Sequence, residues 1–169
     1  VGSVRDTLDM TDHLIARFTP GGELLWYRTI PLPETNDDAR QCFVQGDTLI
    51  VFSFTGDIPS TDTINEGVVG VLRISSAGEL LDSRRLAMPE RFTYGKVMPD
   101  GSGGFFFCTA YLEPLESGMA ECGVLHLNGA LDTVGVPWKV SDLNGIDGSR
   151  GVGLAYDALS NTLFIGGAG

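Results

Sequence analysis

A motif that recurs three times is the sequence feature that most constrains the fold of this chain. Residues 13–26 end in Gly-Gly-Glu-Leu-Leu-Trp, residues 69–82 end in Ala-Gly-Glu-Leu-Leu-Asp, and residues 123–132 repeat the pattern more loosely. Equivalent positions are 56 residues apart between the first two copies and 53 residues apart between the last two. A fixed period of about 50 residues is typical of repeat architectures. The chain is therefore interpreted as a series of repeats.

Each copy contains four short segments that are rich in β-branched and aromatic residues and are separated by turn residues, often glycine. No segment shows an apolar period of 3.6 over ten residues, so essentially no helix is expected. The predicted strands are 13–19, 23–30, 39–45 and 48–55, then 68–74, 79–87, 92–98 and 104–111, then 123–127, 130–140, 149–156 and 162–167.

Four antiparallel strands per repeat of this length are typical of a β-propeller blade. We therefore expect an all-β fold: a β-propeller segment of about three four-stranded antiparallel blades, with essentially no helix. Residues 49–52 and 105–107 are apolar at every position, which fits strands that are buried on both faces. A β-sandwich is the competing fold. It would explain the short strands but not the recurrence of Gly-Glu-Leu-Leu in register.

The predicted domain limits follow the repeats. Residues 1–7 resemble residues 55–63, so the chain is expected to open on the tail of an outer strand. Propellers close with about four to eight blades. We therefore expect an incomplete ring, which is either a part of a longer propeller or a unit that closes by self-association. The limits are 1–12 for the tail of a preceding blade and a linker, 13–67 for the first blade, 68–120 for the second and 121–169 for the third.

Composition excludes some classes of partner. The net charge is -11 and the sequence pI is about 4.4, whereas nucleic acids and anionic membrane surfaces attract clustered Lys and Arg. No apolar run approaches the roughly 20 residues of a membrane helix, so no membrane insertion is expected. The three cysteines, Cys42, Cys108 and Cys122, show no CxxC spacing and indicate neither a disulfide framework nor a zinc site. Buried thiols are expected, with a Cys108–Cys122 disulfide as the alternative.

No arrangement of residues typical of catalysis is found. His13 and His126 fall in predicted strands, where packing or a place at the rim is expected rather than a role as a base. The glycine-rich segment 101–104 is a hairpin turn with no helix behind it, so phosphate binding is not expected. Arg17, Arg73 and His126 are equivalent in the repeats and are expected to end a strand at the solvent edge. A cationic ring that attracts anions is the alternative. No catalytic or cofactor-binding residue is therefore predicted.

Residues 142–148 read Asp-Leu-Asn-Gly-Ile-Asp-Gly and are similar to a calcium loop. Calcium binds about six or more oxygen ligands, and Asp142, Asn144 and Asp147 would supply them here. The spacing differs by one residue from the EF-hand pattern, and no Glu follows at the closing position. A polar turn is the preferred interpretation, and a calcium site is the alternative.

Asp-Thr followed by an aliphatic residue occurs four times, at Thr7, Thr48, Thr63 and Thr133. This resembles the Asp-(Ser/Thr)-aliphatic O-glycosylation motif of exported proteins of Bacteroidota, which implies a covalent glycan on these threonines. Thr7 and Thr63 fall in long polar connections, where a solvated adduct disturbs no packing. Thr133 is intermediate. Thr48 also fits the start of a strand after a turn.

Residues 14–26, together with the strand that ends at 52–56, are similar to the propeller repeats of secreted and cell-surface proteins of Bacteroidota, many of which use type IX secretion. The resemblance covers all three repeats and is loosest in the third. It implies an extracellular or cell-surface scaffold, adhesion or binding module without catalytic activity. Its partners would be the rest of the propeller or other protein subunits.

Residues 22–26 also resemble quinoprotein (PQQ) propeller repeats. This second resemblance implies an alternative function, in which the chain is a fragment of a propeller enzyme, quinoprotein-like or a hydrolase, whose active-site residues lie on absent blades. Two of the three repeats lack the Trp of that motif, and no cofactor-binding residue can be matched.

Overall fold

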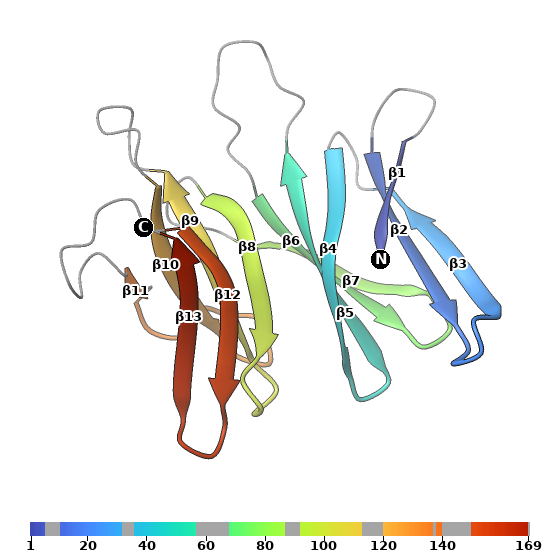
Figure 1. Ribbon diagram of the computed structural model, residues 1–169. Coiled ribbons are helices and arrows are strands. Elements are labelled where there is room, and N and C mark those ends of the chain that lie inside the picture. Colours follow the sequence, from blue (N-terminus) through green and yellow to red (C-terminus); the bar gives the residue numbers. More distant parts are fainter. Residues whose placement is uncertain are drawn as a thin grey trace, which may run out of the picture. The chain divides into compact units, whose positions relative to one another are not determined.

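The fold is known from a computed structural model, which describes residues 1–5, 11–31, 36–56, 68–86, 92–112, 120–136, 138–139 and 150–168. Every regular element in these residues is a β-strand, and all strand pairs are antiparallel (Figure 1). The all-β prediction without helix is therefore confirmed for the described residues. None of them belongs to a helix that is long and apolar enough to span a membrane. The chain divides into two compact units, Val1–Ala87 and Met88–Gly169.

The first unit contains two antiparallel sheets, with the strand orders β1-β2-β3 and β4-β5-β6-β7. The strand predictions between 13 and 87 are confirmed, with ends that differ by a few residues. A short strand at the start of the chain pairs with the first repeat. The strands are β1 (Gly2–Arg5), β2 (Thr11–Phe18), β3 (Leu24–Ile30), β4 (Asn36–Gln45), β5 (Thr48–Gly56), β6 (Val68–Ser75) and β7 (Leu80–Leu86).

The second unit also contains two antiparallel sheets, with the orders β11-β10-β9-β8 and β12-β13. The prediction of a continuous strand over 130–140 is wrong, because among the described residues of this range only β11 (Trp138–Lys139) is a strand. Leu131 and Gly135 have φ angles of 68° and 73°, which break an extended backbone. The other strands are β8 (Phe92–Pro99), β9 (Phe105–Leu112), β10 (Ala120–Leu127), β12 (Arg150–Asp157) and β13 (Thr162–Ala168).

The sheets group the strands differently from the predicted blade limits. The sheet β4-β5-β6-β7 combines the last two strands of the segment 13–67 with the first two strands of the segment 68–120. The sheet β8-β9-β10-β11 crosses the limit between 68–120 and 121–169 in the same way. The repeat in the sequence and the sheet in space therefore differ in phase by two strands.

The hairpin turn that follows the first predicted strand has the same hydrogen bonds in all three repeats. The residue that opens the turn donates its N–H to the carbonyl oxygen four positions later, and its side-chain oxygen accepts the N–H of that same later residue. The pairs are Thr19 with Glu23 (2.8 and 3.1 Å), Ser75 with Glu79 (2.8 and 3.1 Å) and Asn128 with Asp132 (2.9 and 3.0 Å). The loosest sequence match, in the third repeat, is therefore a structural match.

The fourth residue of each turn has a positive φ angle. It is Gly22 (φ 87°) in the first repeat, Gly78 (φ 86°) in the second and Leu131 (φ 68°) in the third. Glycine adopts this conformation without the steric cost of a Cβ atom. Leu131 is only 4% exposed, so burial of its side chain offsets the strain at this position.

The central strands of the first unit are buried on both faces. Val51 and Leu72 belong to the core between the two sheets, together with Ile15 of β2. Phe52 and Val71 point to the opposite face of the same strands and are also buried. This confirms the two-sided burial expected for 49–52, apart from the half-buried Leu49.

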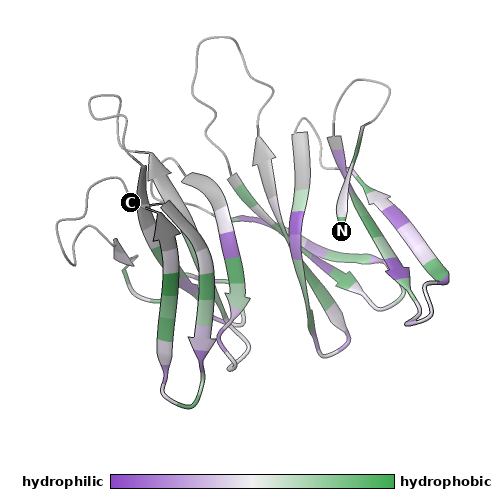
Figure 2. Ribbon diagram, viewed as in Figure 1, coloured by the Kyte–Doolittle hydropathy of each residue, from purple (hydrophilic) through white to green (hydrophobic). Residues whose placement is uncertain are grey.

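The apolar run 105–107 on β9 in the second unit is likewise buried at every position. The sheet β12-β13 contributes Leu154, Tyr156 and Leu163 to the core formed with this strand. Hydrophobic residues are visible along β13 in Figure 2.

Candidate functional site

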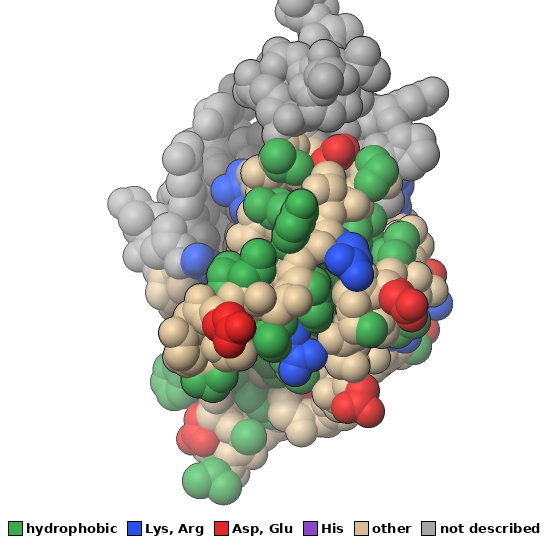
Figure 3. All heavy atoms as spheres, turned by 90° about the vertical axis from the view of Figure 1, so that its right-hand side faces the viewer, with side chains coloured by type: hydrophobic (Ala, Val, Ile, Leu, Met, Phe, Trp, Pro, Cys, Tyr) green, Lys and Arg blue, Asp and Glu red, His purple; other side chains and the backbone are tan. Residues whose placement is uncertain are grey.

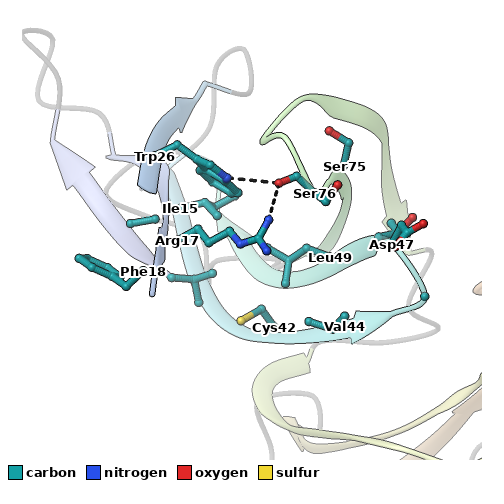
Figure 4. Close-up of a pocket in the computed structure, with 14 residues that line it drawn as sticks. Ile15, Arg17, Phe18, Trp26, Cys42, Val44, Asp47, Leu49, Ser75 and Ser76 are labelled. Carbon is teal, nitrogen blue, oxygen red and sulfur yellow. Dashed lines mark hydrogen bonds between the residues drawn. The ribbon is translucent and has the colours of Figure 1, made fainter. Parts of the chain in front are cut away.

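A pocket of about 390 Å³ opens in the first unit, lined by residues of both its sheets (Figure 4). The volume lies within the range of small-molecule sites, about 300 to 1,000 Å³. One wall comes from β2 and β3, the other from the β4–β5 hairpin, and the turn after β6 closes one end. The lining includes Arg17, Phe18 and Trp26 on the first wall, Cys42, Asp47 and Leu49 on the second, and Ser76 in the turn.

Arg17 and Trp26 are cross-strand partners in β2 and β3, so their side chains lie on the same face of the sheet. Both donate hydrogen bonds to one acceptor, the carbonyl oxygen of Ser76. The distance is 2.9 Å from Nη1 of Arg17 and 3.2 Å from Nε1 of Trp26 (Figure 4). The two side chains therefore connect the first sheet to the turn between β6 and β7.

The turn is also packed against the Trp26 ring. A Cβ atom at Gly78 would lie 3.2 Å from Cε3 of Trp26 and 3.3 Å from its Cδ2. Gly78 is therefore required here for two reasons, its positive φ angle and the close approach of the indole. Trp26 is held by its packing against Gly78 and by its hydrogen bond to Ser76, and both partners belong to the same turn.

Among the described residues, the pocket lining is mainly apolar, and Arg17 is its one cationic side chain. Arg17 carries five N–H donors, and its Ser76 bond uses one of them. Asp47 lies on the opposite wall, and the exposed thiol of Cys42 borders the pocket. An apolar pocket with a few polar groups that fix orientation is the usual form of a small-molecule site.

The second repeat lacks the aromatic wall of this pocket. In the second repeat Arg73 pairs with Asp82 at the position where Arg17 pairs with Trp26. The carboxylate of Asp82 lies 3.5 Å from Nε of Arg84, and both side chains are exposed. The two repeats thus have the same strand pairing here but differ in the side chain opposite the arginine, which is Trp26 in the first and Asp82 in the second.

A shallow hollow runs along the outer strand β3, over residues 24–29. Leu24, Leu25 and Tyr27 of this strand are all about half exposed. Figure 3 shows the face on which β3 lies, where hydrophobic side chains gather between scattered charged groups.

The second unit contains a polar network centred on Asp100, a residue that is only 8% exposed. One carboxylate oxygen accepts the backbone N–H groups of Ser102 and Gly104, at 2.7 and 2.8 Å. The other lies 2.8 Å from Nε2 of His126 and 2.8 Å from Oγ of Ser102. Burial alone would raise the pKa of Asp100, but the hydrogen bonds from His126, Ser102 and Gly104 outweigh it and lower the pKa from 3.8 to about 2.

This network does not have the arrangement of a hydrolytic triad. In a triad the histidine lies between the serine and the carboxylate and takes the serine proton. Here Asp100 lies between Ser102 and His126, so the Ser102 hydroxyl donates to the carboxylate instead. His126 stacks on its cross-strand partner Phe106, with ring centroids 4.6 Å apart. The network therefore fixes the turn after β8 to β10.

The basic residues singled out in the repeats have different surroundings. His13 is buried, with Nδ1 3.3 Å from the carbonyl oxygen of Ile30, as expected for a packed histidine. Arg17 is exposed at the end of β2, as expected for the solvent edge, whereas Arg73 is half-buried. His126 is half-buried beside Asp100. The cationic ring stays a hypothesis.

The prediction that the cysteines are buried is wrong for Cys42, which is exposed, and correct for Cys108. Cys108 is a thiol, so the alternative of a Cys108–Cys122 disulfide is not formed. The side chain of Cys122 lies outside the described residues. Cys42 is exposed because β4 is an edge strand of its sheet and Cys42 borders the open pocket.

The predicted modification and metal sites are described only in part. Thr48 is half-buried in the pocket wall at the start of β5, and Thr133 is exposed. Thr7 and Thr63 lie outside the described residues, as do the calcium candidates Asp142, Asn144 and Asp147. Within the described part of the chain, no group of three or more His, Cys, Asp or Glu residues could hold a metal ion.

A comparison with models of known protein families finds no match to this chain, and a search of curated proteins finds none either. Sequence reasoning missed both the pocket and the Asp100 network. The one signal of the pocket in the sequence was Trp26, which stands where the second repeat has Asp82.

Proposed function

We propose that the chain is a non-catalytic β-propeller segment that serves as a scaffold and binding module at the cell surface or outside the cell. The observation that carries the architecture is the burial of both faces of the central strands. Ile50, Val51 and Phe52 are consecutive on β5 and are at most 1% exposed. Blades of a propeller bury both faces, whereas a sheet in a two-layer sandwich needs only one buried face.

The three matching turns support the same proposal. Thr19, Ser75 and Asn128 open turns with the same hydrogen bonds, one in each repeat. A repeat that recurs in backbone geometry is the unit from which propellers are built. The pocket beside Trp26, which departs from the repeat, supports a binding function.

Mass measurement and scattering test the architecture. Size-exclusion chromatography with light scattering on the 169-residue chain should give an assembly larger than its 18.0 kDa mass. Small-angle scattering from that assembly should fit a disc with a central channel. A stable monomer of 18.0 kDa whose scattering fits an isolated two-layer sandwich would contradict the proposal.

The surface location and the glycan are tested on protein from its native source. Antibody labelling of intact cells should detect the chain without permeabilisation. Intact-mass analysis should show an adduct that peptide mapping assigns to one or more of Thr7, Thr48, Thr63 and Thr133. A mass equal to that of the polypeptide would remove the glycan, and labelling only after permeabilisation would remove the surface location.

A further inference from the structure

We infer that the pocket of the first unit binds a small molecule with an apolar body and a single carboxylate, which Arg17 recognises. This inference adds a ligand class to the proposed binding function, but it depends only on the geometry of the first unit. It does not require the sheets to form a ring.

The apolar body is accommodated by the two walls of the pocket. Trp26 lies on one wall and Leu49 on the other (Figure 4). The cavity of about 390 Å³ is open at one side, so a short alkyl chain or an aromatic ring can enter without a movement of the backbone. Burial of the apolar surface of the ligand against these walls should contribute affinity whatever polar head group the ligand carries.

The carboxylate is recognised by the guanidinium of Arg17. Its bond from Nη1 to Ser76 fixes the side chain within the pocket and leaves the rest of a planar fork, which suits a carboxylate. Because the guanidinium is already held by the protein, little side-chain entropy is lost when a ligand binds. A charged group that is placed in advance in this way favours an anion over a neutral molecule of the same shape.

Asp47, the other charged side chain of the lining, favours a ligand with a single acidic group. Asp47 comes from the hairpin that forms the opposite wall, and its carboxylate disfavours a second anionic group at that end. A monocarboxylate with its acid at Arg17 and its apolar body toward Leu49 pairs with the cation and places no charge beside Asp47. A dicarboxylate that spans the pocket would place like charges together.

The repeats supply an internal comparison. Arg73 is the equivalent of Arg17 in the second repeat, but its cross-strand partner is Asp82 instead of a tryptophan. The combination of a cation and an aromatic wall thus occurs in the first repeat and not in the second. A purely architectural repeat would have no need of this difference.

The test uses three ligands with one tail: octanoate, octan-1-ol and octylammonium. Trp26 and Trp138 are the two tryptophans of the chain, so a Trp138→Phe variant leaves Trp26 as the only tryptophan fluorophore, inside the pocket. Octanoate should change its fluorescence with a Kd about tenfold or more below that of octanol, because a charged hydrogen-bond pair is lost in the alcohol. Octylammonium should bind most weakly. Equal affinity for octanoate and octanol, or a preference for octylammonium, would overturn the inference.

The Arg17→Gln variant should remove the advantage of octanoate over octanol and leave the binding of octanol nearly unchanged. Arg85→Gln, on the exposed strand β7 and outside the pocket lining, is the matched control and should behave as the unmodified chain does. If Arg17→Gln does not fold, the comparison of the three head groups in the Trp138→Phe protein still decides the matter.

Alkylation of Cys42 gives a second readout that does not depend on fluorescence. Octanoate should slow the reaction of Cys42 with iodoacetamide, with the same midpoint concentration as the fluorescence change. An unchanged alkylation rate at saturating octanoate would place the ligand outside this pocket and contradict the assignment. Neither result affects the mass and surface-labelling tests of the proposed function.

Discussion

The indole N–H of Trp26 donates to the carbonyl oxygen of Ser76, 50 residues further along the chain, over 3.2 Å. This bond joins β3 of the first sheet to the turn between β6 and β7 of the second sheet (Figure 4). The same turn contains Gly78, on which the indole packs. The contact between the two sheets and the shape of the pocket therefore both depend on β3 and on the turn between β6 and β7.

Gly78→Ala should destabilise the protein more than Gly22→Ala. The two glycines occupy equivalent turns with φ angles of 86° and 87°, so both substitutions incur the same backbone cost of about 1 kcal/mol. A Cβ atom meets nothing within 4 Å at Gly22, but it lies 3.2 Å from the Trp26 ring at Gly78. The crowding should add about 1 kcal/mol or more to the loss. Urea unfolding of both variants measures the difference, and equal losses would mean that the indole does not press on the turn.

Trp26→Phe should lower the free energy of unfolding by about 1 to 2 kcal/mol, because it removes one hydrogen bond and part of a packed ring. Trp138→Phe is the matched control. Trp138 is 55% exposed, so its loss should cost less than about 0.5 kcal/mol. Chemical unfolding followed by circular dichroism compares the two variants without relying on tryptophan fluorescence. A larger loss for Trp138→Phe would show that Trp26 does not connect the sheets.

Most strands could be predicted because the signals that define them are local. The turns at 20–22 and 76–78 each contain a glycine, and the segments between turns are apolar or alternate. The exception is 130–140, where Leu131 adopts a φ angle of 68°. Nothing in the local sequence marks a leucine for that conformation, because the strain is offset by burial, which is a tertiary effect.

The grouping of strands into sheets could not be read from the repeat. A repeated motif gives the period of the sequence, but the limits of a sheet depend on which strands pair. Strand β5 pairs with β6, although residues 57–67 separate the two strands in the sequence. The pocket needed the same long-range information. Trp26 was visible as a departure from the second repeat, yet its acceptor, Ser76, belongs to another sheet. Asp100 likewise directly precedes the predicted turn at 101–104, but its contact with His126 depends on the pairing of β9 with β10.

The side chains that open the repeated turns should each contribute to stability. Ser75→Ala removes an acceptor for the N–H groups of Ala77 and Glu79, and Asn128→Ala removes one for Ala130 and Asp132. Each variant should lose about 1 kcal/mol in urea unfolding, since a typical net hydrogen bond contributes about that much and these turns are exposed. Ser75→Thr, the residue type found at Thr19 in the first repeat, should keep the stability. A loss with threonine as large as that with alanine would mean that the hydroxyl is not the group that matters.

Asp100 should make stability depend on pH in the acid range. Its pKa is about 2 in the folded protein and near 3.8 without these contacts, so the unfolded chain binds more protons between these values. The contribution, about 2 kcal/mol, is complete above about pH 5 and is lost progressively as the pH falls through about 2. Asp100→Asn should flatten the stability profile in this window, whereas Ser102→Ala, which removes one of several bonds, should only reduce its slope. Urea unfolding measured from neutral to acid pH compares the profiles, and an unchanged slope for Asp100→Asn would assign the acid sensitivity to other carboxylates.

Cys42 and Cys108 should differ strongly in their reaction with iodoacetamide under native conditions. Cys42 is exposed at the mouth of the pocket, whereas Cys108 lies in the core of the second unit with no exposed surface. Cys42 should therefore be alkylated rapidly in the folded protein, and Cys108 only as fast as the second unit opens, because the thiol must reach solvent before it reacts. Peptide mapping by mass spectrometry assigns each rate to a cysteine. A Cys42→Ser variant should lose the rapid alkylation that is assigned to the peptide containing residue 42. Alkylation of Cys108 at the rate of Cys42, without denaturant, would show that the packing of β9 is open in solution.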